Sequence, residues 1–150
     1  MDLLLWRHAD AAEGSPDHAR ILTPRGLKQS QRMASWLDQH APTELSILVS
    51  PATRTRQTAE AWGHSYEISP AVGLDATPQG LLTAAGWPDA GGAVLVVGHQ
   101  PTLGEVASIL LRDESGGLSF KKGSLWWFQL REREGEMQTV LKTVINADLI

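Results

Sequence analysis

Two short, unbroken runs of apolar residues stand out in the chain, and each is followed by a histidine. Leu3–Trp6 is followed by Arg7 and His8, and Val94–Gly98 is followed by His99. An apolar run without alternation predicts a strand that is buried on both faces, as in a parallel sheet. Ligands of open α/β sheets bind just beyond the carboxyl ends of such strands. The pattern therefore predicts that two histidines and an arginine meet at one edge of one sheet.

Amphipathic segments lie between the apolar runs and predict helices. Residues 24–40 follow a Thr23-Pro24 pair, which is typical of a helix N-cap with proline at the first helical position. Ser50-Pro51 repeats this pattern and predicts a second helix that ends near Trp62. Another helix is expected to begin at Pro101, because the apolar residues that follow it recur at helical spacing. The alternation of strands and helices is typical of the α/β class.

The remaining segments complete a chain that we interpret as one domain over residues 1–150. Residues 45–49 predict another strand, and residues 65–92 predict an irregular segment with a short helix near 78–86. Two final strands, at about 124–131 and 137–145, are expected to pair as a hairpin at the sheet edge. No internal repeat or linker divides the sequence.

Composition excludes several classes of protein. With 150 residues, 42% of them hydrophobic and 20% charged, the chain has the balance of an ordinary globular domain. It contains no cysteine, which excludes disulfides, thiolate nucleophiles and cysteine-based zinc sites. The formal net charge of −4 argues against nucleic acid as a partner. No apolar stretch approaches the roughly 20 residues that span a bilayer, and no signal peptide is visible, so we expect a cytoplasmic protein without a membrane partner.

His8 is the candidate nucleophile. A neutral imidazole attacks phosphorus well when its other ring nitrogen is held as N–H by a backbone carbonyl. Taken alone, a polar loop histidine is the simpler interpretation. The adjacent Arg7 favours phosphate chemistry, because its planar set of five donors suits phosphoryl oxygens.

Two further segments are predicted to supply donors to the same anion. Ser50 is expected to cap the helix after it, with Arg54 in the first turn, so that the helix N-terminus and the guanidinium act together. Gly98 permits close backbone approach, and His99 can bind a phosphoryl oxygen and stabilise charge as it develops. A surface helix charge and a strand-end histidine bonded to a loop are the alternatives for Arg54 and His99.

Three residues are weaker candidates. Arg20 is a candidate third phosphate ligand from the loop that covers the site. Asp10 and Asp75 are candidate proton donors or local orienters, although the capping of a loop is the simpler role for each. Arginines, histidines and helix amides can stabilise a phosphoryl group by themselves, so we expect no metal and no other cofactor.

Four motifs carry a resemblance to a known family. They are Arg7-His8-Ala9, Leu22-Thr23-Pro24-Arg25-Gly26, Ser50-Pro51-Ala52-Thr53-Arg54 with Gln57-Thr58-Ala59, and Gly98-His99. Each motif is weak by itself, but the ordered set, between residue 3 and about residue 111, resembles the histidine phosphatase superfamily. Within it, the chain is most similar to the short SixA-type phosphohistidine phosphatases. The resemblance implies a three-layer α/β/α fold with a mainly parallel central sheet.

The resemblance also implies roles for the candidate residues. His8 would be the phosphorylated nucleophile, and Arg7, Arg54 and His99 would form the phosphate pocket. Arg20 joins them in the SixA-type branch. The implied activity is a metal-independent phosphatase that passes through a phosphohistidine intermediate. The implied partner is a protein that carries phosphohistidine, or a small phosphorylated substrate.

Two departures from the family pattern bear on the activity. Ala9 stands where the superfamily has glycine, and residues 62–92 contain no evident general acid, since their only carboxylates are Glu67, Asp75 and Asp89. An imidazole leaving from phosphorus needs less protonation than an alkoxide, so the missing acid favours a phosphohistidine substrate. Two alternatives stay open: a small phosphomonoesterase or mutase of the same superfamily, and a protein that binds phosphohistidine without turning it over.

Overall fold

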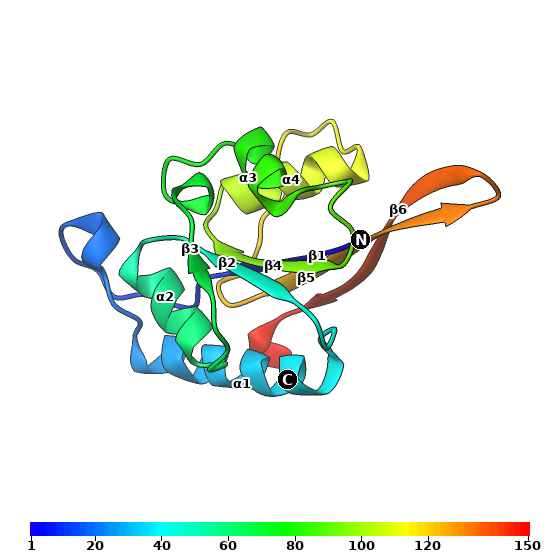
Figure 1. Ribbon diagram of the computed structural model, residues 1–150. Coiled ribbons are helices and arrows are strands. Elements are labelled where there is room, and N and C mark those ends of the chain that lie inside the picture. The colour runs from blue at the N-terminus through cyan, green and yellow to red at the C-terminus, as the bar shows by residue number, and fades with distance from the viewer.

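The structure, a computed structural model, describes residues 1–150. The strands are β1 (Asp2–Arg7), β2 (Ser46–Val49), β3 (Glu67–Ile68), β4 (Ala93–Gly98), β5 (Leu125–Arg133) and β6 (Glu136–Ile145). The helices are α1 (Pro24–His40), α2 (Thr53–Glu60), α3 (Pro78–Ala85) and α4 (Thr102–Leu111). One sheet lies between α1 and α2 on one face and α3 and α4 on the other (Figure 1). The three-layer α/β/α prediction is therefore confirmed. No helix is both long and apolar enough to cross a membrane.

The sheet has six strands in the order β3-β2-β4-β1-β5-β6. β3, β2, β4 and β1 are parallel, whereas β5 and β6 run antiparallel to their neighbours. The predicted terminal hairpin is confirmed at the sheet edge, and it projects away from the body of the molecule (Figure 1). Its turn residues Glu134 and Gly135 both have positive φ, 53° and 80°, as two-residue hairpin turns require.

β1 lies in the middle of the sheet and contributes to the core on both faces. Leu3 and Leu5 pack in the apolar cluster under α3 and α4, and Leu4 and Trp6 pack in the cluster over α1 and α2. All four side chains are fully buried, because successive side chains of a strand point to opposite faces. Truncation of any one of them would cost about 2–5 kcal/mol. The end of β1 is therefore held firmly from both sides.

The predicted helices that became α1 and α3 are present as expected, whereas α2 begins later in the chain than the sequence predicts. Thr23 caps α1 as predicted, since its Oγ1 accepts a hydrogen bond from Gly26 N at 3.0 Å. The predicted helix near residues 78–86 is α3. The prediction that Ser50 caps the second helix is wrong. α2 begins at Thr53 with Ala52 as its N-cap, and it ends at Glu60 rather than near residue 62.

The displaced start of α2 has a physical cause. The Ser50 hydroxyl lies 2.7 Å from His99 Nε2, and it accepts from Ala52 N at 3.3 Å, before the helix begins. It is therefore not available to the first helical turn. His8 follows β1 and His99 follows β4, and both lie at the same end of the sheet as Ser50. The 3-10 turns Asp17–Ala19 and Pro70–Val72 lie next to this end.

Candidate active site

The backbone around His8 fixes both the position and the tautomer of its ring. His8 N donates to Gly98 O at 3.1 Å, and Gly123 N donates to His8 O at 3.0 Å. The ring Nδ1 lies 2.7 Å from Ala9 O. A carbonyl oxygen can only accept, so Nδ1 carries the proton and Nε2 keeps its lone pair. The side chain is buried, with 7% exposure.

The second predicted histidine lies beside the first. β1 and β4 pair in parallel with Arg7 opposite Gly98, so His8 and His99 leave the sheet at the same level. Their ring centroids are 5.4 Å apart and their planes are inclined at 54°. His99 Nε2 contacts the Ser50 hydroxyl, while Nδ1 is buried without a hydrogen-bond partner.

Arg7 and Arg54 bring two guanidinium groups to the same place. Arg7 Nη1 donates to Phe120 O at 2.7 Å, and Arg54 is buried with 5% exposure. Thr58 connects α2 to the segment that follows His8. Its Oγ1 donates to Arg54 O at 2.7 Å and accepts from Ala9 N at 3.1 Å.

Three buried nitrogens of this cluster have no partner. They are Arg7 Nε, Arg54 Nε and His99 Nδ1. Buried polar atoms are nearly always hydrogen-bonded, and those that are not call for an explanation. Two cations and two imidazoles with unused nitrogens together form a site suited to an anion that accepts several hydrogen bonds.

Burial keeps both histidines neutral. It lowers the pKa of His8 to about 3, against the opposing effect of the Ala9 carbonyl, and His99, Arg54 and Arg7 lower it further. Burial and the Arg54 charge lower the pKa of His99 to about 4. The pKa of Arg7 is also lowered, by burial first and by Arg54 second. The cluster is therefore a concentrated region of positive charge around two unprotonated imidazoles.

Three other predicted residues lie next to this cluster in different ways. Arg20 donates through Nε to Ala12 O at 2.8 Å and through Nη1 to Asp17 at 3.1 Å, and Asp17 in turn contacts Arg54. Ser50 is fully buried and contacts His99. Gly98 contributes its carbonyl to His8, and a Cβ there would meet only ordinary van der Waals contacts. Close approach therefore does not require glycine at this position.

The two candidate proton donors are in separate places. The Asp10 carboxylate accepts from Thr23 Oγ1 at 2.7 Å and from Lys122 Nζ at 3.1 Å. These contacts lower its pKa, so the Asp10 carboxylate is held in its ionised form and does not serve as a proton donor, and the structure does not bring it to the cluster. Asp75 is exposed and lines a cavity of about 240 Å³ that also contacts Ser50 and His18.

Sequence reasoning missed Asp17, and it placed Thr58 on the helix face of Arg54 without giving it a role. Asp17 binds Arg54 from the 3-10 turn Asp17–Ala19, within a polar loop that also contains Glu13. Nothing in the pattern distinguishes the two carboxylates. Thr58 had a usable signal, since it follows Arg54 by one helical turn and therefore shares its face.

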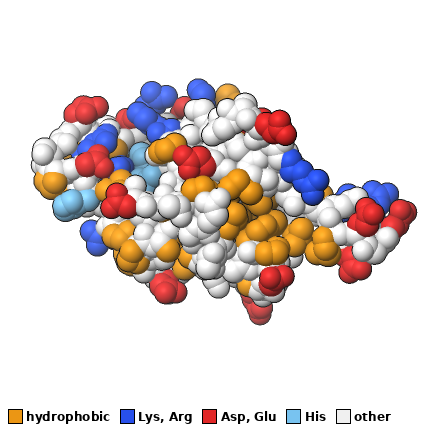
Figure 2. Space-filling model, turned by 90° about the horizontal axis from the view of Figure 1, so that it is seen from above, with side chains coloured by type: hydrophobic (Ala, Val, Ile, Leu, Met, Phe, Trp, Pro, Cys, Tyr) orange, Lys and Arg blue, Asp and Glu red, His pale blue; other side chains and the backbone are white.

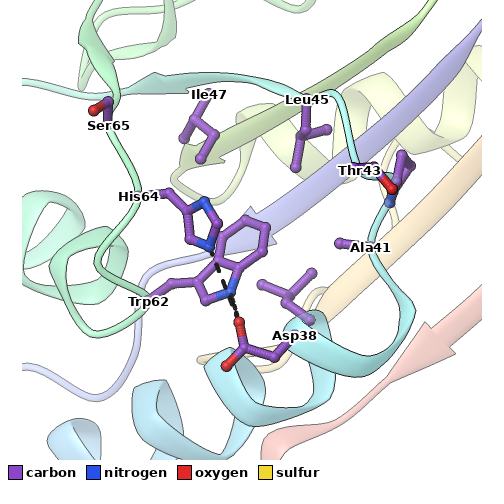
Figure 3. Close-up of a pocket in the computed structure, with 10 residues that line it drawn as sticks. Asp38, Ala41, Thr43, Leu45, Ile47, Trp62, His64 and Ser65 are labelled. Carbon is purple, nitrogen blue, oxygen red and sulfur yellow. Dashed lines mark hydrogen bonds and ion pairs between the residues drawn. The ribbon is translucent and has the colours of Figure 1, made fainter.

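The surface around the site is mixed in charge. Figure 2 shows histidine, basic and acidic side chains gathered at one end of the molecule. A cavity of about 500 Å³ lies elsewhere, near the start of β2, among residues of α1 and of the segment after α2. In Figure 3 the Asp38 carboxylate accepts from Trp62 Nε1 at 2.7 Å and lies 4.0 Å from His64 Nε2. No group of three or more side chains that could hold a metal ion is present.

A parallel sheet that ends in paired histidines and arginines defines a phosphate-handling α/β protein, and comparison with known proteins identifies its family. The chain belongs to the histidine phosphatase superfamily: the model of branch 1 of this superfamily matches residues 3–75, and a relative that matches over a longer stretch agrees. The phosphohistidine phosphatase SixA of Escherichia coli is 33% identical over an alignment of 128 residues, with a coverage of 77% for each chain.

Two solved structures extend the similarity over nearly the whole chain. A SixA-type protein of Nakamurella multipartitia is 28% identical, with a TM-score of 0.78, over 97% of this chain and 95% of that one. A protein histidine phosphatase SixA complexed with tungstate is 26% identical, with a TM-score of 0.77, over 99% of each chain. The superfamily and these neighbours are phosphatases, which supports hydrolysis of a phosphoryl group.

Proposed function

We propose that the protein is a phosphohistidine phosphatase in which His8 is the nucleophile. The observation that carries the proposal is the ring of His8: Nδ1 is held by Ala9 O, so the lone pair of Nε2 is available. Burial keeps this imidazole unprotonated by lowering its pKa to about 3. The similarity to SixA of Escherichia coli and to a SixA structure that holds tungstate, a tetrahedral oxyanion, supports the same activity.

The first chemical step transfers the phosphoryl group to His8. Nε2 attacks phosphorus in line, the P–N bond of the substrate breaks, and the electron pair of that bond leaves with the substrate imidazole. Charge spreads over the three equatorial oxygens, where Arg7, Arg54 and His99 act as donors. Their unpartnered nitrogens are already in place, so little reorganisation accompanies the reaction.

The second step returns the enzyme to its starting state. Water attacks the phosphorus of phosphorylated His8, and the P–N bond breaks to give inorganic phosphate. Because Nδ1 keeps its proton and donates it in a hydrogen bond to Ala9 O, the phosphorylated ring carries a positive charge and leaves as a neutral imidazole. A phosphohistidine substrate whose second ring nitrogen is protonated likewise expels a neutral imidazole in the first step, so neither ring needs a general acid.

A second candidate function, hydrolysis of a phosphate monoester, is favoured by one observation. Asp75 lines the cavity next to Ser50, where the leaving group of a substrate would lie. A carboxyl group there can protonate an alkoxide, which an imidazole leaving group does not need. We therefore expect Asp75→Asn to slow the hydrolysis of an alkyl phosphate much more than that of phosphohistidine.

The test is a substrate panel on the purified protein in excess EDTA. Phosphate release is measured from a phosphohistidine-bearing protein, a sugar phosphate and a nucleotide. We expect rapid release from phosphohistidine, and rapid-quench trapping of a phosphoenzyme that is labile in acid and maps to His8. His8→Ala should form no phosphoenzyme and show no turnover.

Three outcomes would reject the proposal. Turnover that survives in His8→Ala would show that His8 is not the nucleophile. Faster hydrolysis of the esters than of phosphohistidine would favour the second function. A burst of phosphoenzyme without steady release of phosphate would favour a binding protein that does not turn over.

A further inference from the structure

Two arginines share one carboxylate at the rim of the site. Arg54 Nη1 donates to the carbonyl oxygen of Asp17 at 2.8 Å, and Arg54 Nη2 donates to Asp17 Oδ2 at 3.1 Å. Arg20 Nη1 donates to the other carboxylate oxygen at 3.1 Å. The Arg54 side chain is only 6% exposed, whereas that of Asp17 is 57% exposed. The exposed loop that carries Asp17 therefore binds the buried guanidinium of Arg54.

The contacts use only one end of the Arg54 guanidinium. Both terminal nitrogens donate to Asp17, while Nε on the side edge is buried and has no partner. A guanidinium offers five N–H donors in a fixed plane, and a phosphoryl group binds best along one edge. Asp17 therefore leaves the edge that contains Nε for the anion. A carboxylate that occupied the position of the phosphoryl group would instead contact the edge of Arg54 that contains Nε.

We propose that Asp17 is a positioning residue of the phosphatase site: it holds the terminal nitrogens of Arg54 so that the Nε edge faces the phosphoryl group. This inference rests on the proposed function only in taking the bound group to be a phosphoryl oxyanion. Asp17 is not a proton donor here, because its carboxylate is occupied by two guanidinium groups.

The electrostatics of the cluster explain why such a residue is needed. Arg7 and Arg54 are close enough for the charge of Arg54 to lower the pKa of Arg7, so the two cations repel each other when no anion is bound. Asp17 supplies the opposing charge, since its carboxylate contacts Arg54 at 3.1 Å. The loop that carries it is itself held, since Arg20 Nε donates to Ala12 O and Ala12 N donates to Ile21 O.

The experiment measures tungstate binding by calorimetry at constant pH and ionic strength. Asp17→Asn keeps the backbone carbonyl and the side-chain shape but removes the charge. Glu13→Gln is the matched control, because it removes the same charge from an exposed position of the same loop. We expect Asp17→Asn to weaken tungstate binding and to lower kcat/KM roughly tenfold to 100-fold, as a displaced positioning group does, and Glu13→Gln to change neither.

A double-mutant cycle shows whether Asp17 acts through Arg54. In an Arg54→Ala background, Asp17→Asn should cause no further loss, because its partner is already gone. A residue that merely supports the fold would cause the same loss in both backgrounds. Asp17→Ser is measured as a second variant, and urea unfolding of each variant verifies that the fold is retained.

The outcomes separate this inference from the function. Unchanged or tighter tungstate binding in both Asp17 variants would overturn it, as would an undiminished loss in the Arg54→Ala background. A wild-type protein that fails to bind tungstate would overturn it as well. A wild-type protein that binds tungstate but leaves phosphohistidine intact would reject the proposed function alone, because the oxyanion measurements do not depend on turnover.

Discussion

The two buried histidines should make the protein sensitive to mild acid. Burial lowers the pKa of His8 to about 3 and that of His99 to about 4, whereas a histidine of an unfolded chain has a pKa of about 6.5. Below that pH the unfolded chain takes up protons that the folded protein does not, so stability falls as the pH falls. The loss begins near the unfolded pKa and continues down to the two folded values.

The size of the effect follows from these shifts. Each histidine that stays neutral costs about 1.4 kcal/mol for every pH unit below its unfolded pKa. Between pH 6.5 and 4.5 the pair therefore removes on the order of 5 kcal/mol, which is comparable to the whole stability of a small domain, about 5–15 kcal/mol. Carboxylates whose pKa is lowered, such as Asp10 and Asp17, lose their contribution at lower pH, so this window reports mainly on the histidines.

Urea unfolding at a series of pH values, followed by tryptophan fluorescence, measures this slope. His99→Asn should reduce the slope by about half, because one of the two buried imidazoles is removed. His18→Asn, which alters an exposed histidine, should leave it unchanged. A wild-type free energy of unfolding that stays flat between pH 6.5 and 4.5 would refute the reasoning, and with it the neutral His8 on which the nucleophilic role depends.

Three substitutions test other parts of the structure. Arg54→Ala should lower the single-turnover rate of phosphoryl transfer roughly 100-fold to 1,000-fold, and a loss of less than tenfold would contradict its place on the phosphoryl group. Ser50→Ala removes the hydroxyl partner of a buried imidazole, so kcat should fall about tenfold; an unchanged kcat would show that the hydroxyl does not act through His99. Gly26→Ala would make a Cβ clash with Asp10 O and should destabilise the fold by roughly 1–3 kcal/mol in urea unfolding. Gly117→Ala, at a position with nothing within 4 Å, is its control, and equal stability of the two variants would count against the packing described for α1.

The fold was largely readable because its core elements have strong periodic patterns. The apolar run of β1 is fully buried on both faces, and Thr23-Pro24 begins α1 as its cap chemistry predicts. The two-residue strand β3 has no such pattern, and residues 65–92 were therefore expected to be irregular around one helix. Ser50-Pro51 was misleading for a different reason: the serine hydroxyl contacts a residue 49 positions away, and tertiary contact overrode the local signal.

The site was less readable than the fold. Arg7, His8 and His99 follow regular strands, so their convergence could be predicted from the chain, and the structure brings them together. Asp17 could not be found in this way, because it lies in an aperiodic loop and its partner belongs to a different element. Asp10 was a candidate proton donor with the capping of a loop as its simpler role, and the contacts of its carboxylate with the Thr23 hydroxyl and with a lysine from a distant loop agree with the simpler role.

The central place of β1 has a consequence for the folding of the chain during its synthesis. Its two neighbours, β4 and β5, lie far downstream in the sequence, so the first strand to emerge from a ribosome must wait for most of the polypeptide before it acquires either partner. Pairings between such remote segments slow folding and leave apolar strands unprotected in the meantime. His8 directly follows that strand. The His8 ring therefore becomes oriented only when synthesis is nearly complete, and a truncated chain that ends at α4 would still lack β5, one of the two strands that pair with β1.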